Sequence, residues 1–128
     1  MFDFITYGAV FEHLYNPFEL LEKSLGWLRK GGGIHIEVPS SDWFIGKIFN
    51  FYYKIIGTNF VTNLSPMHTP YHIYEFHLDS FKEISNRLGL SIVKHDYQVC
   101  SIPYVPKVFH PILKKYMHLT NQGMQLCI

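Results

Sequence analysis

The sequence predicts an α/β fold, and three runs in its first third carry that prediction. Phe2–Val10 is apolar and rich in β-branched and aromatic residues, with Asp3 as its only charged residue, which is typical of a strand buried on both faces. An apolar pattern with helical spacing follows, and Ile34–Val38 is a second β-prone run that ends at Pro39. A strand, a helix and a strand in this order predict a βαβ unit with parallel strands and a right-handed crossover.

The helix of this unit has start and stop signals. Asn16 fits the N-cap position, and Pro17 fits the first helical position. The apolar stripe that would face the core consists of Phe18, Leu20, Leu21, Leu25, Trp27 and Leu28. Arg29 and Lys30 are expected in the last turn, where cations interact favourably with the helix dipole, and Gly31–Gly33 is expected to end the helix.

A second helix is predicted after the loop residues that follow Pro39. Trp43–Ile56 is apolar nearly all round, and its polar residues Lys47, Asn50 and Lys54 form one narrow stripe. This pattern favours a helix packed on the domain. Two alternatives stay open, a lid over an apolar substrate and a helix lying in a membrane interface.

The last third of the chain predicts a short helix and two further strands. Asp79 is the expected N-cap of a helix that ends at Gly89. The remaining expectations are a strand over Leu90–Val99, an insertion over Pro103–His118 that is helical from about Lys107, and a last strand over Gly123–Ile128.

The composition indicates a folded domain and narrows the class of partner. The chain has 128 residues, 48% of them hydrophobic, which supports a core rather than disorder. A net charge of +1 provides no field that would hold nucleic acid by its phosphates. Cys100 and Cys127 form no disulfide framework and are expected as reduced thiols in a cytoplasmic protein. No apolar run is long enough to span a bilayer, and residues 1–13 lack the marks of a signal peptide.

Two blocks of the sequence resemble class I S-adenosylmethionine-dependent methyltransferases. The first block consists of FDFITYGAVFEHL, the NP pair at the helix start, and LRKGGGIHIEVPS. These pieces resemble the family's fourth strand with its EH end, the next helix, and the L-K-P-G-G turn into the fifth strand. The second block resembles the family's H-x-x-x-F-s passage and comprises Pro70, His72, Phe76, Ser80, Phe81 and Leu88–Leu90. The blocks lie in the family's order and cover about Phe2–Val99.

The resemblance implies a partial Rossmann-like methyltransferase fold with helical insertions. Its mostly parallel sheet would have the order fourth, fifth, seventh and sixth strand, with the seventh antiparallel. The family's glycine-rich first loop and its ribose-binding acid have no counterpart, because Gly31–Gly33 follows a predicted helix rather than a strand.

Residues 1–128 are therefore expected to form one partial domain, the carboxyl-terminal half of a methyltransferase. Within it, residues 1–39 form the βαβ unit, and residues 40–71 form a helical insertion and a loop. Residues 72–128 form a helix, the terminal strands and the second helical insertion.

The carboxyl ends of parallel strands are where open α/β sheets bind ligands. By resemblance, the loop after the first strand lies beside the cofactor, so the expected cofactor-binding residues are Ala9, Val10, Phe11, Glu12 and His13. His13 could also act as a catalytic general base, because histidine titrates near neutral pH. Methyl transfer mainly requires positioning, so a structural role for Glu12 and His13 in holding the loop stays open.

Further candidates lie after the second strand and in the second block. Ser40 and Ser41 end the strand, and His72 matches the family's histidine by resemblance, so these three are expected on the substrate side. His68, His72 and His77 lie beside Glu75, a composition that also occurs in zinc sites. We expect no metal there, because no paired cysteines accompany them and Pro70 interrupts the run.

The resemblance implies methyl transfer from S-adenosylmethionine to a small-molecule acceptor. The aromatic insertions favour an apolar acceptor and leave interfacial membrane contact open as an alternative. A truncated or degenerate homologue without catalysis, acting as an interaction module or having no function, is the alternative function. Because the family's first strand has no counterpart, the Phe2–Val10 edge is expected to pair with a separate amino-terminal half or with a second copy.

Overall fold

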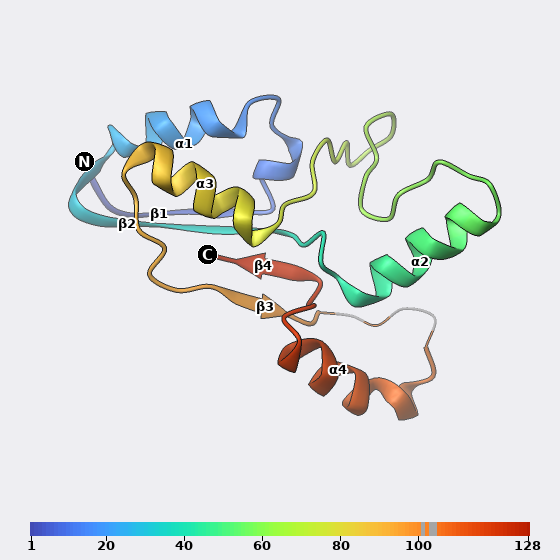
Figure 1. The fold of residues 1–128 in the computed structure, drawn as a ribbon. Helices are drawn as coiled ribbons and strands as arrows, with labels where there is room; N and C mark the ends of the chain where they lie inside the picture. The colour runs from blue at the N-terminus through green and yellow to red at the C-terminus, as the bar shows by residue number, and fades with distance from the viewer. Residues whose placement is uncertain (101, 103–104) are drawn as a thin grey trace.

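The computed structural model describes residues 1–100, 102 and 105–128, and their architecture is α/β (Figure 1). A four-stranded sheet has the order β1-β2-β4-β3. The elements in chain order are β1 (Phe2–Gly8), η1 (Phe11–His13), α1 (Pro17–Leu25), β2 (Leu28–Pro39), α2 (Phe44–Ile55), α3 (Leu78–Leu88), β3 (Asp96–Gln98), η2 (Lys107–Phe109), α4 (His110–Leu119) and β4 (Gln125–Cys127).

The sheet is mixed, as the resemblance implies. β1 and β2 are parallel, and β4 is antiparallel to both of its neighbours, β2 and β3. The order of the strands and the direction of β4 agree with the expectation. Which strand of the family each one corresponds to stays a prediction.

The start of α1 is confirmed, but its end was predicted five residues too late. The Asn16 side chain accepts a hydrogen bond from the backbone N–H of Glu19, and Pro17 occupies the first helical position. The helix ends at Leu25, and Gly26 is the C-cap residue. Arg29 and Lys30 are therefore residues of β2 and lie in no helical turn.

The glycine run Gly31–Gly33 does not end a helix but lies inside β2. The register between β1 and β2 shifts between Phe2 and Phe4, beside this run. Gly31 has a φ of +80°, and a Cβ on Gly32 would lie 2.9 Å from the carbonyl oxygen of Asp3. Glycine is required there because the two strands approach too closely for a side chain.

β1 is mostly exposed, so the prediction of a strand buried on both faces is wrong. Its residues alternate in their last part, with Ile5 and Tyr7 half-buried, while Phe2 and Phe4 are about three-fifths exposed. β1 is exposed because it lies at the edge of the sheet. The helices α1 and α3 also lie over the same face of the sheet, so they cover β1 from one side only (Figure 1).

α3 ends as predicted but begins with a different cap. Gly89 has a left-handed φ of +67° and is the C-cap residue. The N-cap is His77 rather than Asp79, and the His77 Nδ1 accepts a hydrogen bond from the backbone N–H of Asp79. The sequence rule prefers small oxygen-bearing caps, and an imidazole nitrogen acts here in the same way.

The strand expected over Leu90–Val99 is only three residues long. β3 pairs with β4 from Asp96 to Gln98, and β4 itself extends only from Gln125 to Cys127. Residues 90–95 have no strand partner, so their β-prone side chains form no ladder.

Two clusters of buried side chains hold the elements together. The first lies between the sheet and the helices α1 and α3; its buried residues are Phe11, Leu21, Ile36, Val38, Phe76, Phe81, Tyr97 and Leu126. The second joins α2 to α4; its buried residues are Trp43, Ile45, Ile102 and Met117. Figure 1 shows α2 and α4 at the end of the sheet where β1 and β2 finish, away from the face that α1 and α3 cover.

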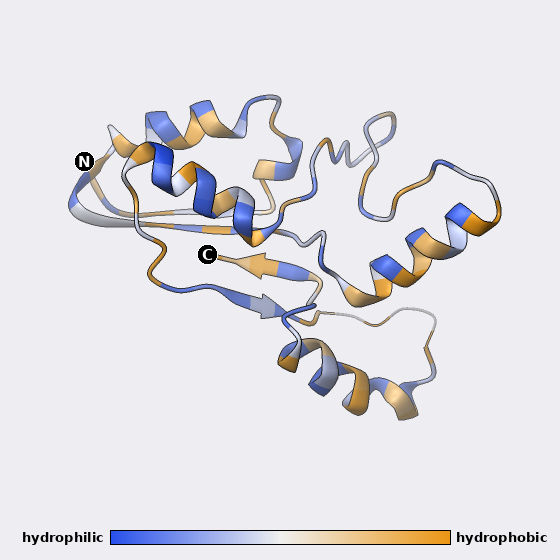
Figure 2. Ribbon diagram, viewed as in Figure 1, coloured by the Kyte–Doolittle hydropathy of each residue, from blue (hydrophilic) through white to orange (hydrophobic). Residues whose placement is uncertain are grey.

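α2 is a helix as predicted, but only its first turns pack on the domain. Ile45 is buried, whereas Phe51 and Ile55 are each 67% exposed. Figure 2 shows the apolar residues along α2 and α4. No helix among the described residues is long and apolar enough to cross a membrane.

Candidate active site

The loop that follows β1 begins the candidate site. Ala9 has a φ of +51°, which turns the chain sharply at the carboxyl end of the strand. The backbone N–H of Ala9 donates to the carbonyl of Glu37, so the last ladder bond of the parallel pair fixes the start of this turn. η1 follows at once and carries Phe11, Glu12 and His13.

Two residues of η1, Phe11 and His13, have opposite environments. Phe11 is fully buried and packs edge-on against the rings of Tyr7 and Phe76. This contact anchors η1 on the first core cluster. His13 is the most exposed of the three η1 residues, with about a third of its side chain accessible. The sequence therefore places an anchored aromatic beside an accessible imidazole.

Glu12 is a buried carboxylate at the centre of this site. Its side chain is 1% exposed, and no described residue gives its Oε2 a hydrogen bond. Its Oε1 lies 3.9 Å from the Nε2 of His13. Burying a carboxylate without partners is costly, so this group requires a cation or a donor that completes its environment.

His72 reaches the same place from a distant part of the chain. The rings of His13 and His72 have their centroids 4.7 Å apart. The backbone N–H groups of Ile73 and Tyr74 donate to the Glu12 carbonyl, which holds the His72 segment against η1. The predicted cofactor-side and substrate-side residues therefore meet in one cluster.

A hydrogen bond orients the His72 ring. His72 Nδ1 lies 2.9 Å from the backbone carbonyl of Asn63, and because a carbonyl can only accept, Nδ1 carries the proton. The Nε2 of a neutral ring is then left with a lone pair. Glu75 lies behind this contact, and its burial raises the pKa of its carboxyl, while a hydrogen bond from the Asn63 side chain acts in the opposite direction.

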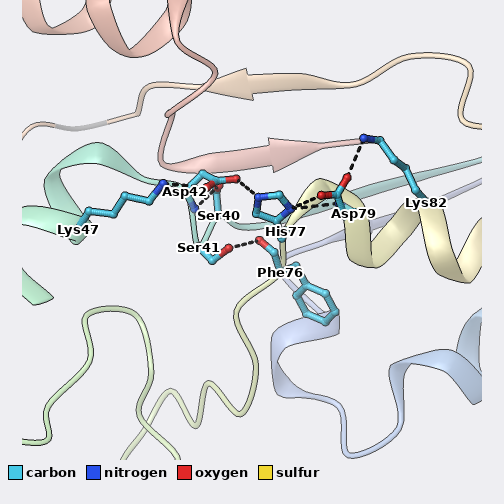
Figure 3. Close-up of polar contacts among 8 residues, drawn as sticks. All are labelled: Ser40, Ser41, Asp42, Lys47, Phe76, His77, Asp79 and Lys82. Carbon is cyan, nitrogen blue, oxygen red and sulfur yellow. Dashed lines mark hydrogen bonds and ion pairs between the residues drawn. The ribbon is translucent and has the colours of Figure 1, made fainter.

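Ser40 and Ser41, which the sequence analysis places on the substrate side, support the loop after β2. Ser40 is fully buried, and its Oγ accepts a hydrogen bond from the backbone N–H of Asp42. The Ser41 Oγ donates to the carbonyl of Phe76, as Figure 3 shows. Both hydroxyls thus join the carboxyl end of β2 to the segment before α3.

A charged network that the sequence analysis did not predict lies beside these serines. His77 Nε2 is 2.8 Å from Asp42 Oδ2, and Lys47 Nζ is 2.8 Å from Asp42 Oδ1 (Figure 3). Because His77 Nδ1 accepts the Asp79 N–H, the Nε2–H donates to Asp42. Lys82 in turn contacts Asp79, and this ion pair lowers the pKa of the Asp79 carboxyl. No sequence motif indicated that Asp42 and His77 would pair.

The three histidines of the H-x3-H-x4-H run do not gather as a group. His77 contacts Asp42 and caps α3, whereas His72 contacts His13. Within residues 1–100, 102 and 105–128, the metal-compatible cluster is Glu12, His13 and His72, whose ligand atoms all lie within 4.8 Å of one another.

A cavity of about 420 Å³ lies elsewhere, away from the carboxyl ends of β1 and β2. It is bounded by β2, α3 and the segment after α3, and its lining includes Ile34, Phe81 and Ile92. None of the predicted site residues lines it. The candidate site is therefore the side-chain cluster at the ends of the strands, not this cavity.

Among solved structures, the chain is similar to a SAM-dependent methyltransferase from Archaeoglobus fulgidus, with a TM-score of 0.58 and 18% sequence identity. The fold is that of a methyltransferase. The match covers 98% of this chain and 57% of that chain, so the sequence spans little more than half the length of that protein. No family model matches the sequence, and no curated protein matches it.

Proposed function

We propose that this chain is part of a class I S-adenosylmethionine-dependent methyltransferase that acts on a small molecule. The observation that carries the proposal is the position of Glu12 and His13, which follow the first strand of a sheet in a chain whose fold is similar to that of a SAM-dependent methyltransferase. Ligands of open α/β sheets bind at this edge. An interaction module or a degenerate homologue gains no specific support from the fold.

The described residues supply one wall of a cofactor site rather than a complete one. η1, with Phe11 to His13, offers the wall at the end of β1. The glycine run lies inside β2, where Asp3 and Phe4 occupy the space above Gly32 and Gly33. A cradle for the ribose and the adenine must come from other residues of the complete protein.

When bound, S-adenosylmethionine supplies an electrophilic methyl group on its sulfonium. The residues of this chain would then orient the acceptor and remove its proton. His13 is suited to that role because its side chain is partly accessible and stands at the strand end. His72 lies against His13 and would help to fix the orientation of its ring.

The binding test uses the 128-residue chain and S-adenosylmethionine. Titration calorimetry should show no saturable heat at micromolar cofactor, because the cradle is not among these residues. A clear saturable signal would show that this chain contains a complete cofactor site and would overturn the one-wall proposal.

The activity test uses the native protein that contains this chain. Methyl-labelled cofactor is incubated with a small-molecule extract, and label should appear in an extractable product. His13→Ala should lower turnover at an almost unchanged melting temperature, while His68→Ala, a histidine outside the cluster, should leave turnover unchanged. Absence of any label transfer would overturn the methyltransferase proposal. A lower melting temperature with normal activity per folded molecule would assign His13 a structural role.

The acceptor, the cellular location and the membrane contact follow as further proposals. The exposed apolar residues of α2, such as Phe51 and Ile55, favour an apolar acceptor. We propose a cytoplasmic location with at most interfacial contact with a membrane.

A further inference from the structure

The Glu12 carboxylate is the least satisfied charged group among the described residues. It is almost fully buried, and its Oε2 has no hydrogen-bond donor there. The nearest nitrogen of His13 is 3.9 Å from the other oxygen, too far for a hydrogen bond. A bound cation would compensate a buried carboxylate of this kind.

His72 is arranged as a metal-binding histidine is. Such a ligand usually donates the proton of one ring nitrogen to a backbone carbonyl or a carboxylate, which turns the other nitrogen toward the ion. His72 Nδ1 makes this bond to the Asn63 carbonyl at 2.9 Å.

The spacing of the three side chains fits a single ion after a small movement. Their ligand atoms lie within 4.8 Å of one another. Nitrogen and oxygen ligands about 2.1 Å from a tetrahedral ion are about 3.4 Å apart, so no pair has to close by more than about 1.4 Å. The partly exposed His13 side chain can rotate toward the other two, while burial holds Glu12 and the Asn63 contact holds His72.

We propose that Glu12, His13 and His72 form a binding site for one divalent first-row transition ion, such as Zn²⁺. Two imidazoles and one carboxylate favour such an ion over Mg²⁺ or Ca²⁺, which prefer oxygen ligands. Three protein ligands leave the fourth position open, as in catalytic zinc sites. In the proposed methyltransferase, an acceptor oxygen could occupy that position, and the ion, in place of His13, would then favour the loss of its proton; this last step rests on the proposed function, whereas metal binding does not.

Metal binding is tested on the untagged 128-residue chain without cofactor. Titration with ZnCl₂ alone should show one ion bound per chain, and saturating Zn²⁺ should raise the melting temperature, because an ion that binds only the folded state stabilises it. Co²⁺ should give a visible spectrum without the near-ultraviolet thiolate band, which excludes Cys100 and Cys127 as ligands.

Three variants each change one proposed ligand, and one matched control changes a histidine of the same loop that is not a proposed ligand. Glu12→Gln preserves the shape of the side chain, and His13→Asn removes Nε2. His72→Asn keeps an N–H donor near the position of Nδ1 while it also removes Nε2. Each should weaken Zn²⁺ binding at least about tenfold and abolish the rise in melting temperature. His68→Asn, on the same loop, should bind like the parent chain.

The outcomes distinguish this proposal from the proposed function. No binding at micromolar Zn²⁺, unchanged affinity in Glu12→Gln and His72→Asn, or equal loss in His68→Asn would each overturn the metal site. Glu12→Gln should also melt at a higher temperature than the metal-free parent chain, because it removes a buried charge. A failed methyl-transfer assay leaves these measurements unaffected.

Discussion

At the scale of single residues, His77 connects two elements that the sequence presents as separate. Its Nδ1 caps α3 through Asp79, and its Nε2 contacts the Asp42 carboxylate after β2. Only a spatial contact brings Asp42 to His77, so the sequence pattern of the histidines, from which no metal site was expected, could not indicate this pair either. The same limit applies to Glu12 and His72: each was predicted near the site, but their meeting depends on how the loop before α3 folds back.

His77→Ala should lower the free energy of unfolding by about 1–2 kcal/mol. Loss of an N-cap costs about 1 kcal/mol, and the partly exposed contact with Asp42 adds at most about 1 kcal/mol. Urea unfolding measures the change. His77→Asn should cost clearly less, because its amide oxygen can replace the capping nitrogen. An equal loss in both variants would show that capping is not the source of the stability.

Cys127 makes the stability of the fold sensitive to alkaline pH. Burial, with the nearby carboxylates of Glu37 and Asp96, raises the pKa of its thiol to about 11. In the unfolded chain a thiol has a pKa of about 8.5. Between these values the unfolded state loses the proton and the folded state keeps it, so the unfolded state binds fewer protons. Stability is therefore fully present below about pH 8.5 and falls as the pH rises toward 11.

The change in the free energy of unfolding with pH is measured by urea unfolding between about pH 8 and pH 10.5. This thiol contributes a loss of at most about 1.4 kcal/mol per pH unit. Burial also raises the pKa values of Tyr97 and Cys100, which act in the same direction. Cys127→Ala should reduce the slope more than Cys100→Ala does, because Cys127 is the more buried residue and its thiol has the larger rise in pKa. Equal slopes in the two variants would contradict the assignment.

At the scale of elements, local signals predicted the helices well and the lengths of the strands poorly. The caps Asn16 and Gly89 are determined by the residues around them, so the sequence was sufficient. The Gly31–Gly33 run carries the same local signal as a C-cap, but its role depends on the approach of β1. β3 is short because its partner β4 is short, which no property of residues 90–99 could indicate.

The short β4 also leaves part of β2 without a partner on one side. Ile36 exchanges two backbone hydrogen bonds with Ile128. The next residue of β2 with its N–H on that side is Ile34, because neighbouring residues of a strand point their N–H groups to opposite sides. Ile34 lines the cavity, and no described residue accepts from its N–H.

The rate of hydrogen exchange should therefore differ between the amides of Ile34 and Ile36 in β2. The Ile34 amide should exchange faster than the Ile36 amide in native buffer, because only Ile36 has its bond to Ile128. Nuclear magnetic resonance resolves the two residues. His35 serves as the control, because its N–H faces β1 and should be protected. Equal protection of Ile34 and Ile36 would indicate that another segment fills the cavity in solution.

At the scale of the whole molecule, the sheet is covered unevenly. α1 and α3 lie over one face of the sheet (Figure 1), while Phe2 and Phe4 of β1 remain mostly exposed. β1 also forms one edge of the sheet, with β2 as its sole neighbour among the described strands. We therefore propose the β1 edge as the surface at which a second chain would add.

The 128-residue chain alone should therefore self-associate in solution through β1. The unpaired outer edge of β1 is a template for another strand, and its exposed phenylalanines add an apolar surface. The Ala9 N–H points to β2, so by alternation the Thr6 N–H points outward. Thr6→Pro removes that outward donor without breaking a backbone bond to β2, although it also removes the exposed side-chain hydrogen bond between Thr6 Oγ1 and His35 Nδ1, and it should shift the chain toward a monomer.

Size-exclusion chromatography with light scattering measures the molecular mass of the parent chain and of Thr6→Pro. Tyr7→Pro is the matched control, because the Tyr7 N–H faces β2; this variant should lose a ladder bond and stability instead of association alone. A parent chain that elutes as a monomer of 15.1 kDa, with protected amides at Thr6 and Gly8, would show that the outer edge is covered within the chain itself. Self-association that persists unchanged in Thr6→Pro would place the contact elsewhere, and the exposed face of α2, with Phe51 and Ile55, would then be the next surface to vary.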